Sequence, residues 1–157
     1  MNSFGSPADS LSHEHEAVRQ LTQLLQQEQE HLIAADIDGI ASLTEPKAKA
    51  ATRMAELAAW RHNALAAAGC EASENGMKAW LATSGVSKTT SQSWHELIEL
   101  AKVAKEINRV NGTLIGKQMV RNQNMLNILQ HGSVQGDHVY GPNGQTGGKS
   151  VGRHIIA

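Results

Sequence analysis

An uninterrupted helical stretch with an apolar residue at every seventh position constrains this chain most. The heptad positions are Leu11, Val18, Leu25 and Leu32. Residues 8–35 contain no Pro or Gly, and Gln and Glu, which favour helices, occupy many of the other positions. Because residues at this spacing lie along one side of a helix, the segment is predicted to pack along its length against another helix.

The composition favours one small helical domain. The chain has 157 residues, of which 40% are hydrophobic and only 3% are aromatic. Much of the apolar content is Ala, so we expect a thin core of Ala, Leu, Ile and Met between closely packed helices. Cores rich in β-strands draw instead on aromatic and β-branched residues. The composition therefore predicts an all-α protein.

Capping and helix-breaking residues predict an elongated antiparallel bundle of three long helices with a short connector helix. The expected bounds are about 7–35, 36–68, 76–83 and 93–130. Ser6 and Pro7 have the types expected at a helix start. Gly39 predicts a kink or a short turn, and Pro46 fits the first turn of a second long helix. A capping box at Ser93 predicts the start of the third long helix, which we expect to end near Gly132.

Some positions depart from a simple apolar stripe. Arg61 interrupts the stripe of the second helix, and we expect its stem to cover apolar surface while its head reaches water. Gly112 and Gly116 have the spacing of closely packed small residues, which predicts close packing or a local bend. The third long helix carries polar residues at heptad-like intervals: Asn108, Asn111, Gln118 and Asn122. Two interpretations of these remain open, namely internal hydrogen bonds that fix the helix register and a surface that faces water or a partner.

Residues 132–157 differ in kind from residues 1–131, which we expect to form the helical bundle. The last segment holds seven of the 14 glycines and few large apolar residues. Such a segment buries too little surface to offset the entropy of ordering its backbone, so it is predicted to be a mobile tail. Val139, Tyr140 and Pro142 combine an apolar and aromatic pair with a turn sequence. On a flexible arm, these three residues are candidate docking anchors.

The remaining candidate partner-binding residues lie near the end of the third long helix. They are Asn122, Met125, Leu126 and Leu129. Leu and Met at helical spacing offer an apolar face, and Met suits surfaces that repack around a partner. We therefore expect the end of this helix and the tail to contact another polypeptide.

Enzymatic, metal and cofactor chemistry finds no support in the motifs. The chain has eight histidines, but no His-x-x-x-His pair with the spacing that a helical metal site requires. Cys70 is the single cysteine, so neither an intramolecular disulfide nor a thiol pair is available. The segment from Gly144 to Ser150 is one residue short of a phosphate-binding loop and follows no expected strand. We expect no catalytic residue, no metal and no cofactor.

Charge and hydropathy limit the classes of partner. The formal net charge is −1, so the chain lacks the basic character that nucleic-acid binding requires. No apolar run approaches the roughly 18 residues of a membrane span, and the N-terminal residues lack the pattern of a secretory signal. We expect a cytoplasmic protein that binds neither nucleic acid nor membrane.

The order of these features resembles the FlgN family. The likeness covers nearly the whole chain: the Gln- and Glu-rich heptads, the Ala-rich second helix, the Asn-bearing third helix and the motif from Tyr140 to Gly144. The resemblance implies a cytoplasmic export chaperone of the flagellar type III system. It also implies two hook–filament junction proteins, FlgK and FlgL, as cargo, and delivery to the export gate and its ATPase complex.

Two other hypotheses remain open. A structural coiled-coil adaptor would form a stable oligomer and would have no effect on secretion. A helical phosphotransfer domain would need an exposed histidine in mid-helix, followed closely by Lys and Gly, and none of the eight histidines has this setting. Against both, the chaperone hypothesis explains the polar end of the third helix and the tail together.

Overall fold

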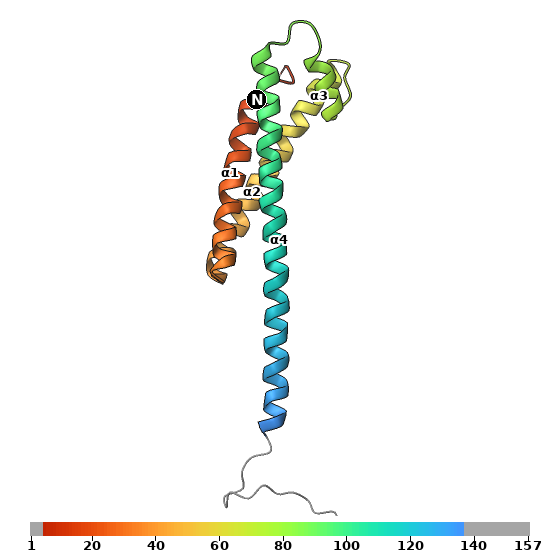
Figure 1. Ribbon diagram of the computed structural model, residues 1–157. Coiled ribbons are helices and arrows are strands. Elements are labelled where there is room, and N and C mark those ends of the chain that lie inside the picture. The colour runs from red at the N-terminus through yellow and green to blue at the C-terminus, as the bar shows by residue number, and fades with distance from the viewer. Residues whose placement is uncertain (1–4, 137–157) are drawn as a thin grey trace, which may run out of the picture. The chain divides into compact units, whose positions relative to one another are not determined.

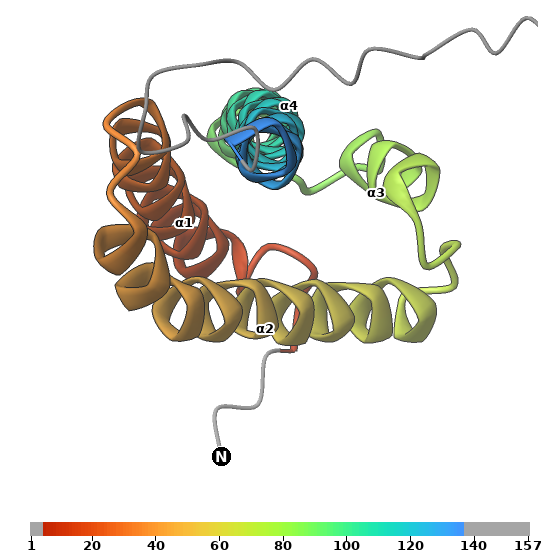
Figure 2. The ribbon, with the colours of Figure 1, turned by 90° about the horizontal axis from the view of Figure 1, so that it is seen from below.

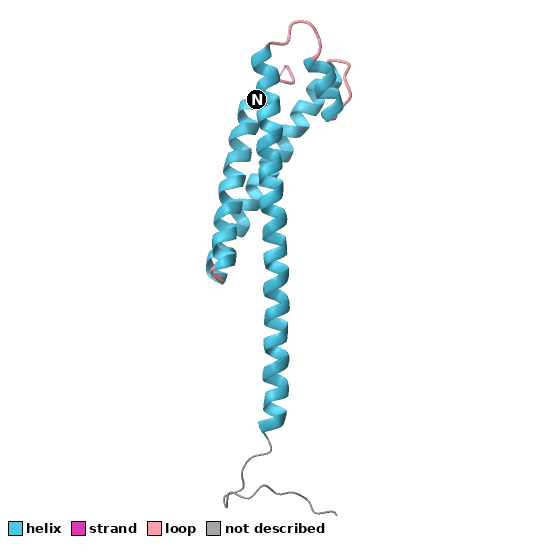
Figure 3. Cartoon of the chain, viewed as in Figure 1, coloured by secondary structure: helices cyan, strands magenta, loops and turns pink. Residues whose placement is uncertain are grey.

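The computed structural model describes residues 5–136 and the side chains of residues 5–131, and every regular element in this part is an α-helix (Figures 1 and 3). The four helices are α1 (Leu11–Ile33), α2 (Ile37–Ala67), α3 (Glu74–Leu81) and α4 (Lys88–Gly136). The predicted all-α class and the short connector helix are confirmed. Among the described residues, no helix combines the length and the apolar character that crossing a membrane requires.

Ser6 and Pro7, which were expected at the start of a helix, lie in a turn that precedes α1. The carboxylate of Asp9 accepts hydrogen bonds from the backbone N–H groups of Gly5 and Ser6, at 2.9 and 2.8 Å. Ser6 in turn accepts one from the N–H of Ala8. α1 therefore begins at Leu11, later than the expected start near residue 7.

The break between α1 and α2 lies just before Gly39. Ala35 has a φ of 53°, a left-handed conformation that is uncommon for a residue with a Cβ. The side chain of Asp36 then accepts a hydrogen bond from the N–H of Gly39 at 3.0 Å and caps α2. Because this cap starts α2 so early, Pro46 lies inside the helix. The expectation that Pro46 stands in a first helical turn was wrong.

The core confirms the heptad prediction for the first helix. Leu11, Val18, Leu25 and Leu32 are each at most 4% exposed. The first three belong to a cluster to which all four helices contribute; its other buried members are Leu65, Met77, Trp94, Leu97 and Ala104. Figure 2 looks along α4 and shows α2 from the side, so the axis of α2 is inclined to that of α4.

α4 begins earlier and ends later than expected. The hydroxyl of Ser87 accepts a hydrogen bond from the N–H of Thr90, and the helix starts at Lys88. Ser93 therefore lies within the helix, and the expected capping box there was wrong. The carbonyl oxygen and the hydroxyl of Ser93 instead contact Nε2 of His15, at 2.8 and 3.2 Å. α4 also continues past Gly132 to Gly136.

The chain forms two compact units, Met1–Gly116 and Lys117–Ala157. The predicted division at residues 131 and 132 stays a prediction, as does the mobility of the tail, because residues 137–157 lie outside the described part. The antiparallel, elongated arrangement of three long helices likewise remains a prediction.

Candidate partner-binding site

Four of the seven predicted partner-binding residues are described, and all four are exposed on α4. Met125, Leu126 and Leu129 expose 64%, 57% and 67% of their surface, and Asn122 is exposed as well. Val139, Tyr140 and Pro142 lie outside the described residues. The structure thus brings the first four together on one helix.

The spacing of these residues places them on one face of α4. Met125, Leu126 and Leu129 follow Asn122 by three, four and seven positions, which are neighbouring positions on a helix surface. Met119 precedes Asn122 by three positions and is 66% exposed. We call the five residues together the α4 stripe. Met119 was missed by the sequence analysis, although the same spacing rule would have found it.

The α4 stripe exposes apolar surface that water solvates poorly. Burying a Leu or Met side chain contributes about 1.5–3 kcal/mol, so four such residues offer a strong driving force for association. Contiguous apolar surface of this kind marks interaction sites on soluble proteins. Val120 and Ile128 are also exposed, at 61% and 69%, but helical periodicity places them on other faces of α4. The stripe is therefore the face best suited to a partner.

The charge around the α4 stripe is positive. Residues 117–131 include Lys117 and Arg121 but no Asp or Glu. Arg121 precedes Met125 by four positions and so lies beside the stripe, whereas Lys117 lies on the far side of α4. A partner segment with carboxylates beside its own apolar face would complement this surface.

The polar residues of α4 divide between the two open interpretations. Asn111 is 1% exposed, and its amide nitrogen donates to the carbonyl oxygen of Leu25 at 2.8 Å and to Glu28 at 3.0 Å. This residue therefore fixes the register of α4 on α1, as a buried Asn does in a coiled coil. Asn108 and Asn122 are exposed, and Gln118 is half-buried. The register interpretation is thus confirmed for Asn111, whereas Asn108 and Asn122 face solvent.

The described residues offer no grouping suited to metal chemistry. Nowhere in residues 5–131 do three His, Cys, Asp or Glu side chains come close enough to hold a metal ion. Cys70 is half-buried near the end of α2, and its thiol is free.

A comparison with protein families identifies the family of this chain. The family described as FlgN protein matches residues 1–148, which is almost the whole chain. The chain belongs to the FlgN family. FlgN proteins are flagellar export chaperones, so the protein acts in flagellum biogenesis and protein export. No curated protein and no solved structure gave a significant match.

The α4 stripe is a candidate surface for the activity of a FlgN protein. An export chaperone needs a surface that holds another polypeptide. In this FlgN chain the largest exposed apolar side chains include Met119, Met125 and Leu129, all on α4. The first part of the same helix is anchored to α1 through Asn111 and His15.

Proposed function

We propose that this FlgN protein binds the helical ends of the hook–filament junction proteins FlgK and FlgL through the α4 stripe in the cytoplasm. Binding would keep these subunits from assembling prematurely and would deliver them to the flagellar export gate and its ATPase complex. The single observation that carries the proposal is the row of exposed apolar side chains on one face of α4, at Met119, Met125, Leu126 and Leu129. Subunits that polymerise through their ends carry adhesive amphipathic segments, and a helix face of this kind covers such a segment.

The size of the interface argues that more than the α4 stripe takes part. A stable protein interface buries about 800 Å² on each partner, which is more than five side chains on one helix supply. Val139, Tyr140 and Pro142, which follow in sequence, are the residues we propose to complete the contact. An aromatic anchor such as Tyr140 is a common source of binding energy in interfaces.

A pair of matched variants tests the stripe. Met125→Gln and Leu129→Gln, combined in the full-length chain, remove apolar surface while keeping residues that favour a helix. We expect calorimetric affinity for purified FlgK and FlgL to fall by at least about tenfold, because each lost contact costs about 1–2 kcal/mol.

The control is Val120→Gln, which changes an equally exposed apolar residue on the opposite side of α4. Its affinity should match that of the unmodified chain. Equal affinity for the unmodified chain, the combined variant and the control would show that the stripe does not bind cargo. A loss of affinity in the control alone would show that another face of α4 binds it.

A further inference from the structure

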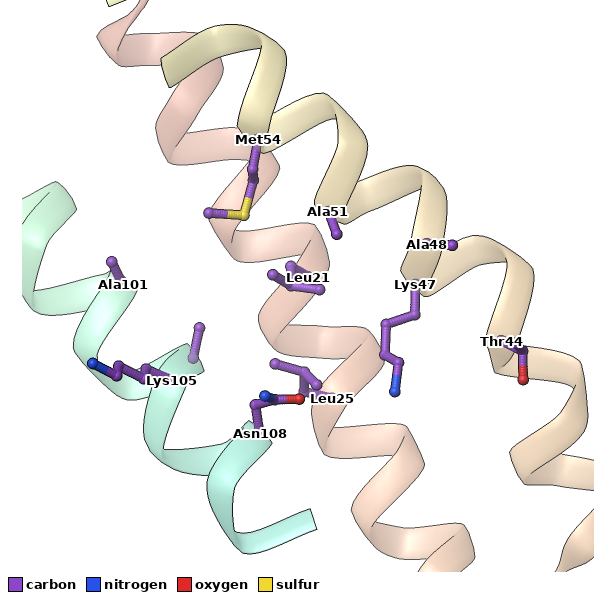
Figure 4. Close-up of a pocket in the computed structure, with 11 residues that line it drawn as sticks. Leu21, Leu25, Thr44, Lys47, Ala48, Ala51, Met54, Ala101, Lys105 and Asn108 are labelled. Carbon is purple, nitrogen blue, oxygen red and sulfur yellow. The ribbon is translucent and has the colours of Figure 1, made fainter. Parts of the chain in front are cut away.

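An apolar hollow lies within the unit Met1–Gly116, between α2 and α4. Its cavity has a volume of about 540 Å³. Figure 4 shows how α1, α2 and α4 surround it. Its apolar lining includes Leu21 and Leu25 of α1, Ala48 and Ala51 of α2, and Ala101 and Ala104 of α4. Ala48 and Ala51 are exposed, so the hollow opens to solvent along α2.

A smaller cavity of about 180 Å³ continues this hollow toward the N-terminal end of α4. Met54 and Ala101 line both cavities. Val18 and Leu97 extend the apolar lining, and Arg61 and Trp94 line the far end. We call the two cavities together the α2–α4 groove.

The dimensions of the groove match one helix. Along α2 the lining residues run from Thr44 to His62, and along α4 from Trp94 to Asn108. At 1.5 Å per residue these stretches measure about 27 and 21 Å, the length of about 14–18 helical residues. Alanines on both walls leave space for another backbone to approach closely. The groove thus has the form of a helix-in-groove site.

The polar groups along the wider cavity are positively charged or neutral. Of the described residues, Lys47 and Lys105 line it, and no Asp or Glu does. Lys47 forms an ion pair with Glu28. Lys105 is exposed and forms no ion pair with any described residue. Figure 4 shows its side chain on α4 with the nitrogen directed away from α1 and α2. Its flexible four-carbon stem lets the ammonium group turn toward a carboxylate on an incoming helix.

The smaller cavity is also lined by a residue with an unsatisfied hydrogen-bond donor. Arg61 pairs with Glu14, but its Nη1 is buried and has no hydrogen-bond partner among the described residues. Glu74 is the second acid on this lining, and its charge acts on Lys102, whose pKa is raised by Glu99 and to a smaller extent by Glu74. Among the described Lys and Arg residues that line the groove, Arg61 and Lys105 therefore lack a full complement of partners, and they lie at opposite ends of it.

The same charges argue against an occupant from this chain. Residues 117–157 carry four Lys or Arg and a single Asp. If the α4 stripe of a second copy entered the groove, it would bring Arg121, beside the stripe, to a rim that already holds Lys47 and Lys105. Like charges brought together in an interface oppose binding.

From the shape and the charge of the groove we infer that it is a docking site for an acidic amphipathic helix of a partner protein. The apolar face of that helix packs on Leu21 and Leu25, and carboxylates beside the face pair with Lys105 and reach toward Arg61. This site is separate from the α4 stripe and goes beyond the proposed function.

Two designed helical peptides of about 18 residues test the site. Both have a Leu and Ala face; one carries Glu at the flanking positions and the other carries Lys. With fluorescein-labelled peptides and the full-length protein, anisotropy should show the acidic peptide binding at least about tenfold more tightly than the basic one. Added salt should weaken the acidic peptide's binding, because it screens the rim charges.

Variants then locate the binding. Ala51→Trp fills the groove from an exposed position and should abolish binding of the acidic peptide, whereas Ala59→Trp, exposed on α2 outside the groove, should not. Lys105→Glu should weaken the acidic peptide by about three- to tenfold. Lys88→Glu makes the same charge change on α4 away from the groove and should have no effect. Circular dichroism melting confirms that each variant folds.

Several outcomes would overturn the inference. Equal affinity for the two peptides, failure of the unmodified protein to bind either, or full binding by Ala51→Trp would each do so. Sedimentation tests the rival occupant: an oligomer that Ala51→Trp converts to a monomer would assign the groove to a second copy. The combined Met125→Gln and Leu129→Gln variant should bind the acidic peptide normally, so the stripe and the groove can fail separately.

Discussion

Glu14 of α1 and Arg61 of α2 form an ion pair inside the protein. Nε of Arg61 lies 3.2 Å from both carboxylate oxygens of Glu14, and the two side chains are only 10% and 6% exposed. The guanidinium group also lies over the ring of Trp94, with its carbon 4.6 Å from the ring centroid. The expectation that the head of Arg61 reaches water was therefore wrong. This residue joins α1, α2 and α4.

Removing one partner of the ion pair should destabilise the protein strongly, whereas replacing both partners with apolar residues should destabilise it little. Arg61→Met or Glu14→Leu alone leaves one buried charge without its partner, which should lower the free energy of unfolding by about 3–5 kcal/mol. The double variant removes both charges, so we expect it to regain most of that loss. Urea denaturation of the four proteins measures this. Additive losses in the double variant would contradict the argument.

Asn111 offers a second test, because its neighbour Asn108 is a matched control. Asn111→Ala removes the hydrogen bonds to Leu25 and Glu28 and leaves a buried carbonyl and a carboxylate oxygen without this donor. We expect a loss of about 1–3 kcal/mol in the free energy of unfolding. Asn108→Ala, at an exposed position in the lining of the α2–α4 groove, should change stability by no more than about 0.5 kcal/mol. Equal effects would show that the buried bonds do not hold α4 in register.

Local sequence signals predicted where the helices lie better than they predicted where each helix begins and ends. The heptad of α1 needed only a regular period, and the buried Leu25 and Leu32 confirm it. Helix starts depended on which of several capping residues is used. Asp36 caps α2 and Ser87 caps α4, although Pro46 and Ser93 have equally suitable residue types.

Features that depend on contacts between residues far apart in the sequence could not be predicted from local patterns. Glu14 lies 47 residues before Arg61 in the sequence and Trp94 lies 33 residues after it, so no local pattern could place the head of Arg61 in the interior. The α4 stripe was more predictable, since Met125, Leu126 and Leu129 needed only helical spacing. The α2–α4 groove was not predictable, because it depends on how the axes of two helices diverge.

Gly112 and Gly116 should be replaceable with a gain in stability. A Cβ added at either position would meet no atom of the described residues within 4 Å, so this part of the chain does not pack closely on them as predicted. Gly112→Ala and Gly116→Ala should each raise the free energy of unfolding by about 0.5–1 kcal/mol, since Gly loses more backbone freedom in a helix. Gly76→Ala is the contrasting control, because its Cβ would collide with the backbone of Glu71. A lower melting temperature for Gly112→Ala than for the unmodified protein would contradict the prediction.

Tyr140→Ala tests whether the segment beyond α4 takes part in cargo binding. If Tyr140 anchors the contact with FlgK, its removal should weaken calorimetric affinity by at least about tenfold, as truncation of a central aromatic residue does in many interfaces. His138→Ala, two residues earlier in the sequence, controls for a general effect of changing the segment and should leave the affinity unchanged. Undiminished affinity in Tyr140→Ala would remove this residue from cargo recognition. Export of FlgK measured in cells that carry the same variant would then show whether Tyr140 acts at the export gate.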